Sequence, residues 1–182
     1  MPRFSLTQEA DAPSEVGKIY RDFQRKMGLP EVPNFVRTLG ASPSVLAAMW
    51  GLMENVLLEG HLPRSTKELI FLAVAADREC RYCKEAHTAC CRILGVEDST
   101  IQAVMGGLKG DIPDPIRDII HFAVKCAATP EELNDEDFAS LKRRGLDTKQ
   151  TLEVIATAST AVYLTIICDA TMLEPDAMFA KM

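Results

Sequence analysis

The chain is punctuated by residues that begin and end helices, whereas signals for β-strands are scarce. Proline follows Ser42 and Asp114 in what would be a first helical turn, and glycine closes several apolar stretches. These glycines are Gly28, Gly40, Gly60, Gly95 and Gly145. No Asn-Gly or Asp-Gly pair is present to form a hairpin turn, and apolar residues do not alternate with polar ones over any long stretch. The sequence therefore predicts an all-α fold.

Apolar residues that recur every three or four positions locate the helices. We expect them at 14–27, 34–39, 43–59, 65–76, 80–94, 97–105, 135–144 and 148–173, with another that begins at Asp114-Pro115. Ser14 and Ser42 are the expected N-caps, and Ser65-Thr66-Lys67-Glu68 has the form of a capping box. Residues 1–14 are expected to form an extended arm that precedes the helical domain, 15–182.

Two similar tripeptides, Thr66-Lys67-Glu68 and Thr148-Lys149-Gln150, both open long apolar helices. They suggest that the bundle derives from a degenerate duplicated helical unit, although the second copy lacks a cysteine pair. No low-complexity segment or long linker divides the chain. We therefore expect a single domain.

The composition excludes several classes of protein. With 182 residues, 47% of them hydrophobic, the chain can bury the core of one domain without structural disulfides. Its net charge of −6 argues against a nucleic-acid partner, which needs a basic surface. No uninterrupted apolar run reaches the roughly 18 residues of a membrane span, and the first residues form no secretory segment. We expect a cytoplasmic protein, in which six cysteines need an explanation other than disulfide bonds.

One segment, Cys80-Arg81-Tyr82-Cys83-Lys84-Glu85-Ala86-His87, combines residues suited to thiol chemistry. Positions three and four apart share a face of a helix, so Cys80, Cys83 and His87 can converge. In a first helical turn, the dipole and the unpaired amides favour the thiolate, which is the nucleophile towards peroxides and disulfides. His87 can accept the proton of Cys83. Glu68 can orient the imidazole if the preceding helix packs antiparallel.

Each of these residues also has a purely structural interpretation. Glu68 could be no more than the last residue of a capping box, and Tyr82 is most simply a packing aromatic. The other cysteines are expected to be small apolar core residues: Cys90, Cys91, Cys126 and Cys168. His61 and His121 stand in no pattern that indicates a partner.

The order Glu68, eleven intervening residues, Cys80-x-x-Cys83, three residues and His87 resembles the signature of the AhpD-like alkylhydroperoxidases. These proteins belong to the carboxymuconolactone decarboxylase superfamily. Shorter segments resemble its peroxidase-related branch: Pro33-Asn34-Phe35, Pro43, Leu62-Pro63-Arg64 and 118–129. The resemblance extends over roughly residues 15–176. Because the decarboxylase branch lacks the cysteine pair, the resemblance disfavours decarboxylation.

The resemblance implies an AhpD-like helical bundle that assembles as a homo-oligomer, namely a dimer, trimer or hexamer. It also implies that Cys83, deprotonated through His87 and Glu68, attacks a hydroperoxide and becomes a sulfenic acid. Cys80 would resolve this to a Cys80–Cys83 disulfide, and a thiol reductant of lipoyl or thioredoxin type would restore both thiols. No metal or organic cofactor is implied. Tyr82 stands where well-studied relatives carry a histidine, which makes it a candidate accessory residue.

The leading hypothesis is therefore a peroxidase that reduces organic hydroperoxides or hydrogen peroxide. Two other functions fit the same residues. A thiol–disulfide oxidoreductase or redox sensor would use the thiols on a protein partner instead of a peroxide. A structural zinc site could use Cys80, Cys83, His87 and Cys91, although four ligands from one helix surround a tetrahedral ion poorly.

Overall fold

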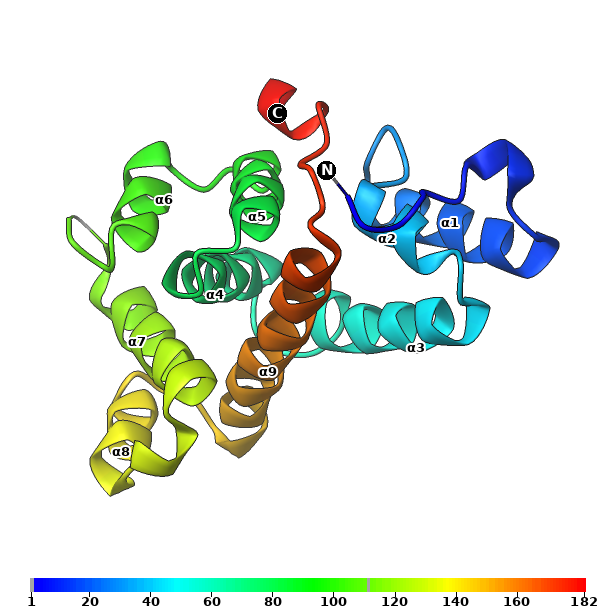
Figure 1. The fold of residues 1–182 in the computed structure, drawn as a ribbon. Coiled ribbons are helices and arrows are strands. Elements are labelled where there is room, and N and C mark those ends of the chain that lie inside the picture. The colour runs from blue at the N-terminus through cyan, green and yellow to red at the C-terminus, as the bar shows by residue number, and fades with distance from the viewer. Residues whose placement is uncertain (1, 111) are drawn as a thin grey trace.

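The computed structural model describes residues 2–110 and 112–182, which form a bundle of helices (Figure 1). Within these residues there are nine α-helices and no β-strand, which confirms the predicted all-α fold. The helices are α1 (Ser14–Met27), α2 (Asn34–Leu39), α3 (Pro43–Met53), α4 (Arg64–Asp77), α5 (Arg81–Ile93), α6 (Asp98–Met105), α7 (Asp114–Ala128), α8 (Asp135–Arg143) and α9 (Thr148–Thr171). Each begins within one residue of its predicted start.

Short helical turns fill some of the connections. The 3-10 turns are Glu9–Asp11, Pro130–Glu132 and Phe179–Lys181. The prediction of one helix over 43–59 is wrong in detail, because α3 ends at Met53 and the backbone continues as a π-helical turn, Glu54–Leu58.

Helix α4 lies at the centre of the bundle. All ten residues from Thr66 to Ala75 are buried, because α5, α6, α7 and α9 pack against it. A helix covered on every side has no need of a polar face, and this explains the unbroken apolar run of α4. Figure 1 shows α1, α2 and α3 grouped on one side of α9 and α5 to α8 on the other.

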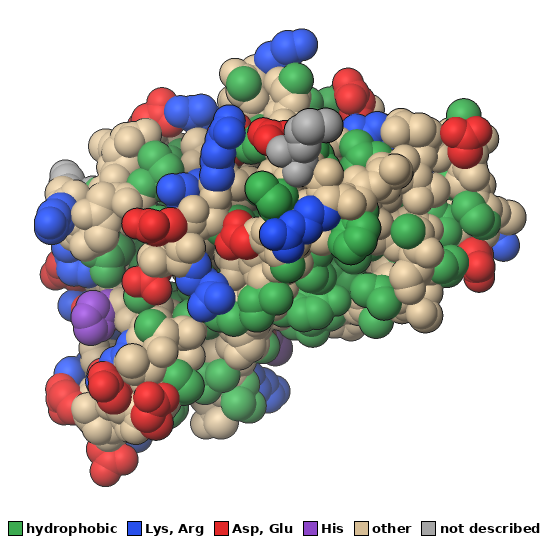
Figure 2. All heavy atoms as spheres, in the orientation of Figure 1, with side chains coloured by type: hydrophobic (Ala, Val, Ile, Leu, Met, Phe, Trp, Pro, Cys, Tyr) green, Lys and Arg blue, Asp and Glu red, His purple; other side chains and the backbone are tan. Residues whose placement is uncertain are grey.

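Helix α9 is long and apolar enough to cross a membrane by length and composition. Nearly half of its most apolar stretch is nevertheless buried inside the protein, where it packs against α4, α5 and α7. This burial is typical of the central helix of a compact domain. Figure 2 shows hydrophobic side chains across the middle of one face and acidic side chains at the end formed by α8.

The N-terminal arm is tied to distant parts of the chain. The peptide N–H of Arg3 donates to the Thr171 carbonyl at 2.9 Å, and that of Thr7 donates to the Arg37 carbonyl at 3.1 Å. The side chain of Tyr20 in α1 also donates to the Thr7 carbonyl, at 3.2 Å. Apart from its 3-10 turn, the arm therefore follows the surface of α2 and the end of α9.

Two of the predicted helix caps are wrong. Pro13 and Pro63, not Ser14 and Ser65, occupy the N-cap positions of α1 and α4, and neither makes a side-chain cap. Proline fixes the backbone for the first helical turn, so both helices begin directly after it. As a result, Glu68 lies one turn inside α4 and its carboxylate is free to pair within the core.

Side-chain capping occurs at two other helices. Asn134 with Asp137 forms a capping box at α8, and Asp147 with Gln150 forms one at α9. Ser42 occupies the N-cap position of α3 but makes no side-chain cap. Thr148 is therefore the first residue of its helix whereas Thr66 is the third, so the two similar tripeptides open their helices in different registers.

A partly buried ion pair joins the turn before α4 to α9. The Glu153 carboxylate accepts hydrogen bonds from the peptide N–H groups of His61 and Leu62, at 2.8 and 2.9 Å. It also lies 3.2 Å from the ammonium of Lys67, which is fully buried. Gly60 has a φ of +103°, and a Cβ atom there would lie 2.6 Å from the Glu153 carboxyl group, so the turn requires glycine. His61 thus has a partner that its sequence context did not indicate.

This pair predicts a loss of stability in acid. Burial alone would raise the pKa of Glu153, but the two peptide N–H groups, His61 and Lys67 outweigh it and lower the pKa from 4.5 to about 2. The ionised carboxylate therefore stabilises the fold above pH 4.5, and this contribution is lost as the pH falls towards 2. Glu153→Gln should lower the free energy of unfolding by about 3 kcal/mol at pH 7. Urea unfolding at pH 7, 4.5 and 3 should show the difference from wild type shrinking, and a constant difference would contradict the assignment.

Candidate active site

A tight turn between α4 and α5 sets the geometry of the site. Glu79 has a φ of +58°, and the peptide N–H of Cys80 donates to the Ala75 carbonyl at 3.0 Å. The left-handed residue reverses the chain, so that α5 packs back along α4. Residues on the facing sides of the two helices are thereby brought together.

Glu68 and His87 form a buried pair across these helices. Nδ1 of His87 donates to Oε2 of Glu68 at 2.7 Å, and the glutamate side chain is fully buried. Nε of Arg64 lies 3.4 Å from the other carboxylate oxygen. The imidazole also stacks on the Phe71 ring, with the ring centres 4.6 Å apart. Because Nδ1 is engaged, the imidazole is fixed with Nε2 as the nitrogen available for proton transfer.

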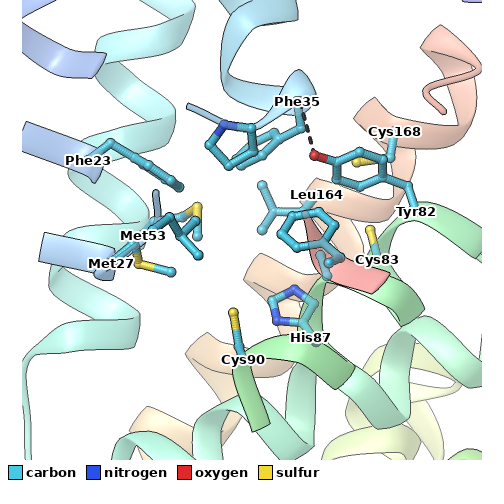
Figure 3. A pocket seen from close by; sticks show the side chains of 14 residues that line it. Phe23, Met27, Phe35, Met53, Tyr82, Cys83, His87, Cys90, Leu164 and Cys168 are labelled. Carbon is cyan, nitrogen blue, oxygen red and sulfur yellow. Dashed lines mark hydrogen bonds between the residues drawn. The ribbon is translucent and has the colours of Figure 1, made fainter. Parts of the chain in front are cut away.

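An apolar pocket opens in front of His87 and Cys83 (Figure 3). Its walls come from helices far apart in the sequence: α1, α2 and α3 on one side, α5, α9 and the C-terminal turn on the other. Aromatic and aliphatic side chains make up most of the wall, among them Phe23, Met27, Phe35, Met53, Leu164 and Phe179. Such a lining suits a ligand with a hydrophobic substituent.

The cysteine pair stands at the start of α5 with both thiols free. Cys80 is the N-cap residue of α5 and Cys83 lies in its first turn. Both are buried, but Cys83 lines the pocket whereas Cys80 does not. A ligand in the pocket would therefore meet the sulfur of Cys83.

The two thiols are in different electrostatic environments. Contacts with the thiols of Cys168 and Cys83, together with the peptide N–H of Cys83, hold the pKa of Cys80 well below its usual range. Contact with Cys168 also lowers the pKa of Cys83, but the charge on Cys80 and burial outweigh it, so the pKa of Cys83 is raised. The neighbouring thiols and the peptide N–H of Cys83 thus favour the thiolate at Cys80, whereas Cys83 needs a base to lose its proton.

Tyr82 is a buried polar link and not merely a packing aromatic. Its hydroxyl donates to Oδ2 of Asp176 at 2.6 Å and accepts from the peptide N–H of Phe35 at 3.2 Å. Asp176 in turn accepts from the peptide N–H of Asn34 at 3.0 Å. Burial and the Asp176 charge raise the pKa of Tyr82, so its hydroxyl keeps its proton. Tyr82 thereby holds α2 and the C-terminal segment against α5 beside the pocket.

We expect Tyr82→Phe to destabilise the fold by about 2 kcal/mol, because it leaves the Phe35 N–H and the Asp176 carboxylate without their buried partner. The measurement is urea unfolding followed by circular dichroism. Tyr163→Phe is the matched control, since the Tyr163 hydroxyl makes no hydrogen bond among the residues that the structure describes. An equal loss of unfolding free energy in both variants would show that the hydrogen bonds of Tyr82 do not stabilise the fold.

The remaining cysteines lie in three different environments. Cys91 is fully buried in a second apolar cluster with α6 and α7, as expected for a core residue. Cys126 is half-buried on α7 and Cys90 lines the pocket next to His87. The prediction that Cys168 is only a core residue is incomplete: it is buried, but it lines the pocket and contacts Cys80 and Cys83. In residues 2–110 and 112–182, no group of three or more His, Cys, Asp or Glu side chains is arranged to hold a metal ion.

Comparisons with known proteins agree with this architecture. Residues 43–109, from the start of α3 to just beyond α6, match the model of the carboxymuconolactone decarboxylase family. A peroxidase-related protein with an AhpD core from Ralstonia eutropha JMP134, known from a crystal structure, shares 26% of its sequence with this chain. The two structures superpose with a TM-score of 0.91 over 100% of this chain and 95% of that one. Residues 43–109 thus resemble the carboxymuconolactone decarboxylase family, and the whole chain shares the fold of a peroxidase-related protein with an AhpD core.

A curated relative of this AhpD-like chain is the alkyl hydroperoxide reductase Rv2159c of Mycobacterium tuberculosis (strain ATCC 25618 / H37Rv). It is 32% identical over 100 residues, which are 55% of this chain but only 28% of the relative. The match therefore spans little more than a quarter of that protein. The debrominase Bmp8 shares the fold at 22% identity, with a TM-score of 0.82 over 97% of this chain and 93% of that one.

Proposed function

We propose that this AhpD-like protein is a thiol-dependent peroxidase that reduces hydroperoxides through Cys83 and Cys80. The observation that carries the proposal is the buried Glu68–His87 pair, which faces an apolar pocket also lined by Cys83. A carboxylate that orients an imidazole beside a nucleophile is a recurrent arrangement for removing the proton of that nucleophile.

In the first step, His87 takes the proton of Cys83 and Glu68 stabilises the resulting imidazolium. The Cys83 thiolate then attacks the distal oxygen of the hydroperoxide, the O–O bond breaks, and Cys83 becomes a sulfenic acid. The leaving alkoxide takes the proton from His87 and departs as an alcohol. His87 thus serves first as a base and then as an acid, which requires the fixed ring orientation that Glu68 provides.

In the second step, the thiolate of Cys80 attacks the sulfenic sulfur of Cys83 and the S–O bond breaks. The hydroxide that leaves takes a proton from solvent and becomes water. The product is a Cys80–Cys83 disulfide, and the low pKa of Cys80 supplies a thiolate for this attack at neutral pH. A dithiol then reduces the disulfide and returns both residues to thiols. A reductant of lipoyl or thioredoxin type is the chemical class that fits this exchange.

The pocket lining favours organic hydroperoxides over hydrogen peroxide, because burial of an apolar substituent against the phenylalanine and methionine side chains adds binding free energy.

The proposed reaction uses no metal or organic cofactor. It places the protein in the cytoplasm, where thiols are kept reduced. It also includes a homo-oligomer, and a single-chain mass in light scattering at micromolar concentration would refute that part.

The test is steady-state turnover of the purified protein with dihydrolipoamide as the dithiol. Cumene hydroperoxide should be consumed catalytically, with a higher kcat/KM than hydrogen peroxide. A parallel assay with oxidised glutathione measures disulfide reduction under the same conditions. Turnover of the disulfide without turnover of either peroxide would reject the peroxidase and establish a thiol–disulfide oxidoreductase in its place.

A further inference from the structure

A third cysteine, Cys168, completes a cluster of thiols at the end of the pocket. It lies in the last turn of α9, far from Cys80 and Cys83 in the sequence, and only 3% of its surface is exposed. Figure 3 shows its sulfur behind the Tyr82 ring, on the same side of the pocket as Cys83. Cys83 and Cys168 line the same pocket, and interactions with the thiols of Cys80 and Cys83 raise the pKa of Cys168. The two helices that carry the three residues pack directly against each other.

We propose that Cys168 is a third redox thiol of the site, which competes with Cys80 to form a disulfide with oxidised Cys83. The inference rests on the proposed peroxidase function for the sulfenic acid, but the cluster itself does not depend on that function. Cys168 and Cys83 both line the pocket, whereas Cys80 lies outside it. The sulfur of Cys168 can therefore approach Cys83 from the side on which a hydroperoxide has reacted.

The step needs no oxidant beyond the hydroperoxide. The sulfur of Cys168 attacks the sulfenic sulfur of Cys83, the S–O bond breaks, and the oxygen leaves as water with the thiol proton and one further proton from the hydroxyl group. A Cys83–Cys168 disulfide forms. The same disulfide arises by exchange when Cys168 loses its thiol proton to solvent water and attacks Cys83 in the Cys80–Cys83 disulfide, so that the S–S bond breaks and Cys80 leaves as a thiolate. Exchange is fastest when the leaving thiol has a low pKa, which is the case for Cys80.

A neighbouring carboxyl group supports the departure of Cys80. Asp169, the next residue of α9, interacts with Cys80, and burial and this interaction raise the pKa of Asp169 to about 6. Below that pH the protonated carboxyl group can donate a hydrogen bond to the departing thiolate. Cys168 itself is held as a thiol in the reduced protein, because its contacts with Cys80 and Cys83 and its burial raise its pKa.

The test uses the Cys80→Ser variant, since serine is a preferred N-cap residue and preserves the start of α5. One equivalent of cumene hydroperoxide should remove two of its five remaining thiols, and peptide mapping should identify a Cys83–Cys168 disulfide. The double variant Cys80→Ser/Cys168→Ala should lose one thiol only and form a dimedone adduct at Cys83. Dimedone labelling of Cys83 in the single variant, with Cys168 still free, would overturn the inference and leave the peroxidase function intact.

Diamide, which oxidises neighbouring thiols without a sulfenic acid, separates the two proposals. If the hydroperoxide oxidises nothing but diamide forms Cys83–Cys168, the third thiol is supported and the peroxidase is rejected. If diamide also leaves Cys168 free, the inference is wrong. The wild-type chain provides a measurement that needs no Cys80 variant: mapping after oxidation should detect a Cys83–Cys168 peptide that disappears in Cys168→Ala.

Discussion

Replacement of Cys83 by serine is expected to reduce the consumption of cumene hydroperoxide by on the order of 10³-fold or more, to the uncatalysed background. A serine hydroxyl fits the same space in the first turn of α5 but is almost never ionised, so it cannot attack the peroxide oxygen. The measurement is the initial rate of hydroperoxide loss with dihydrolipoamide as reductant.

Two other cysteines provide the controls for Cys83→Ser. Cys126 is half-buried on α7 and does not line the pocket, and Cys91 lies in the second apolar cluster. Cys126→Ser and Cys91→Ser should therefore keep nearly the full rate, although the second variant places a hydroxyl in the core and is expected to unfold at lower temperature. Equal rates for wild type and Cys83→Ser would reject the assigned nucleophile.

Glu68→Gln should lower kcat/KM for the hydroperoxide by about 10²–10³-fold at pH 7. Glutamine has nearly the shape of glutamate, so the bundle is preserved, but it carries no charge to stabilise the imidazolium of His87. Raising the pH to 9.5 should not restore the rate, because the pKa of Cys83 is raised and its thiol still needs His87 to remove the proton. The measurement is the pH dependence of kcat/KM between pH 6 and 9.5.

A surface carboxylate serves as the control for Glu68→Gln. Glu85 lies on α5, and its partly exposed side chain pairs with Arg81 at 3.2 Å. Glu85→Gln removes the same charge from the neighbourhood without touching His87, and it should leave the pH profile unchanged. An unaltered profile in Glu68→Gln would show that the buried carboxylate has no part in proton transfer.

The sequence predicted the helices well because their ends are local features. Proline and glycine act on the backbone within a turn, so the starts of α3 and α7 follow directly from Ser42-Pro43 and Asp114-Pro115. The capping roles of Ser14 and Ser65 were wrong for a related reason. Each follows a proline that already occupies the N-cap position, and the preference of the serine for that position is overridden.

The sequence predicted the pairing of Glu68 with His87 only on the condition that the two helices that carry them pack antiparallel. The structure fulfils that condition through the left-handed conformation of Glu79, a residue that seldom adopts it and gives no signal in the sequence. Cys83 and His87, in contrast, lie one turn apart in the same helix and line the same pocket, as local periodicity predicted for this pair. Cys80 is the N-cap residue of that helix and lies outside the pocket.

Two parts of the site depend on contacts that no local pattern encodes. Asp176 meets the Tyr82 hydroxyl across 94 positions of the sequence, and Cys168 reaches the cysteine pair from the end of α9. In the sequence, Cys168 stands among apolar residues like any small core residue. Its proximity to Cys83 follows from the way α9 crosses α5, which is a property of the whole bundle.

The most direct test of the peroxidase function is a count of free thiols in the wild-type protein before and after one equivalent of cumene hydroperoxide. Mass spectrometry then maps the cysteines that have changed. We predict that the six thiols fall by two, that the main product is the Cys80–Cys83 disulfide, and that a dithiol restores all six. Six thiols that remain free after exposure to the hydroperoxide would contradict the proposed function.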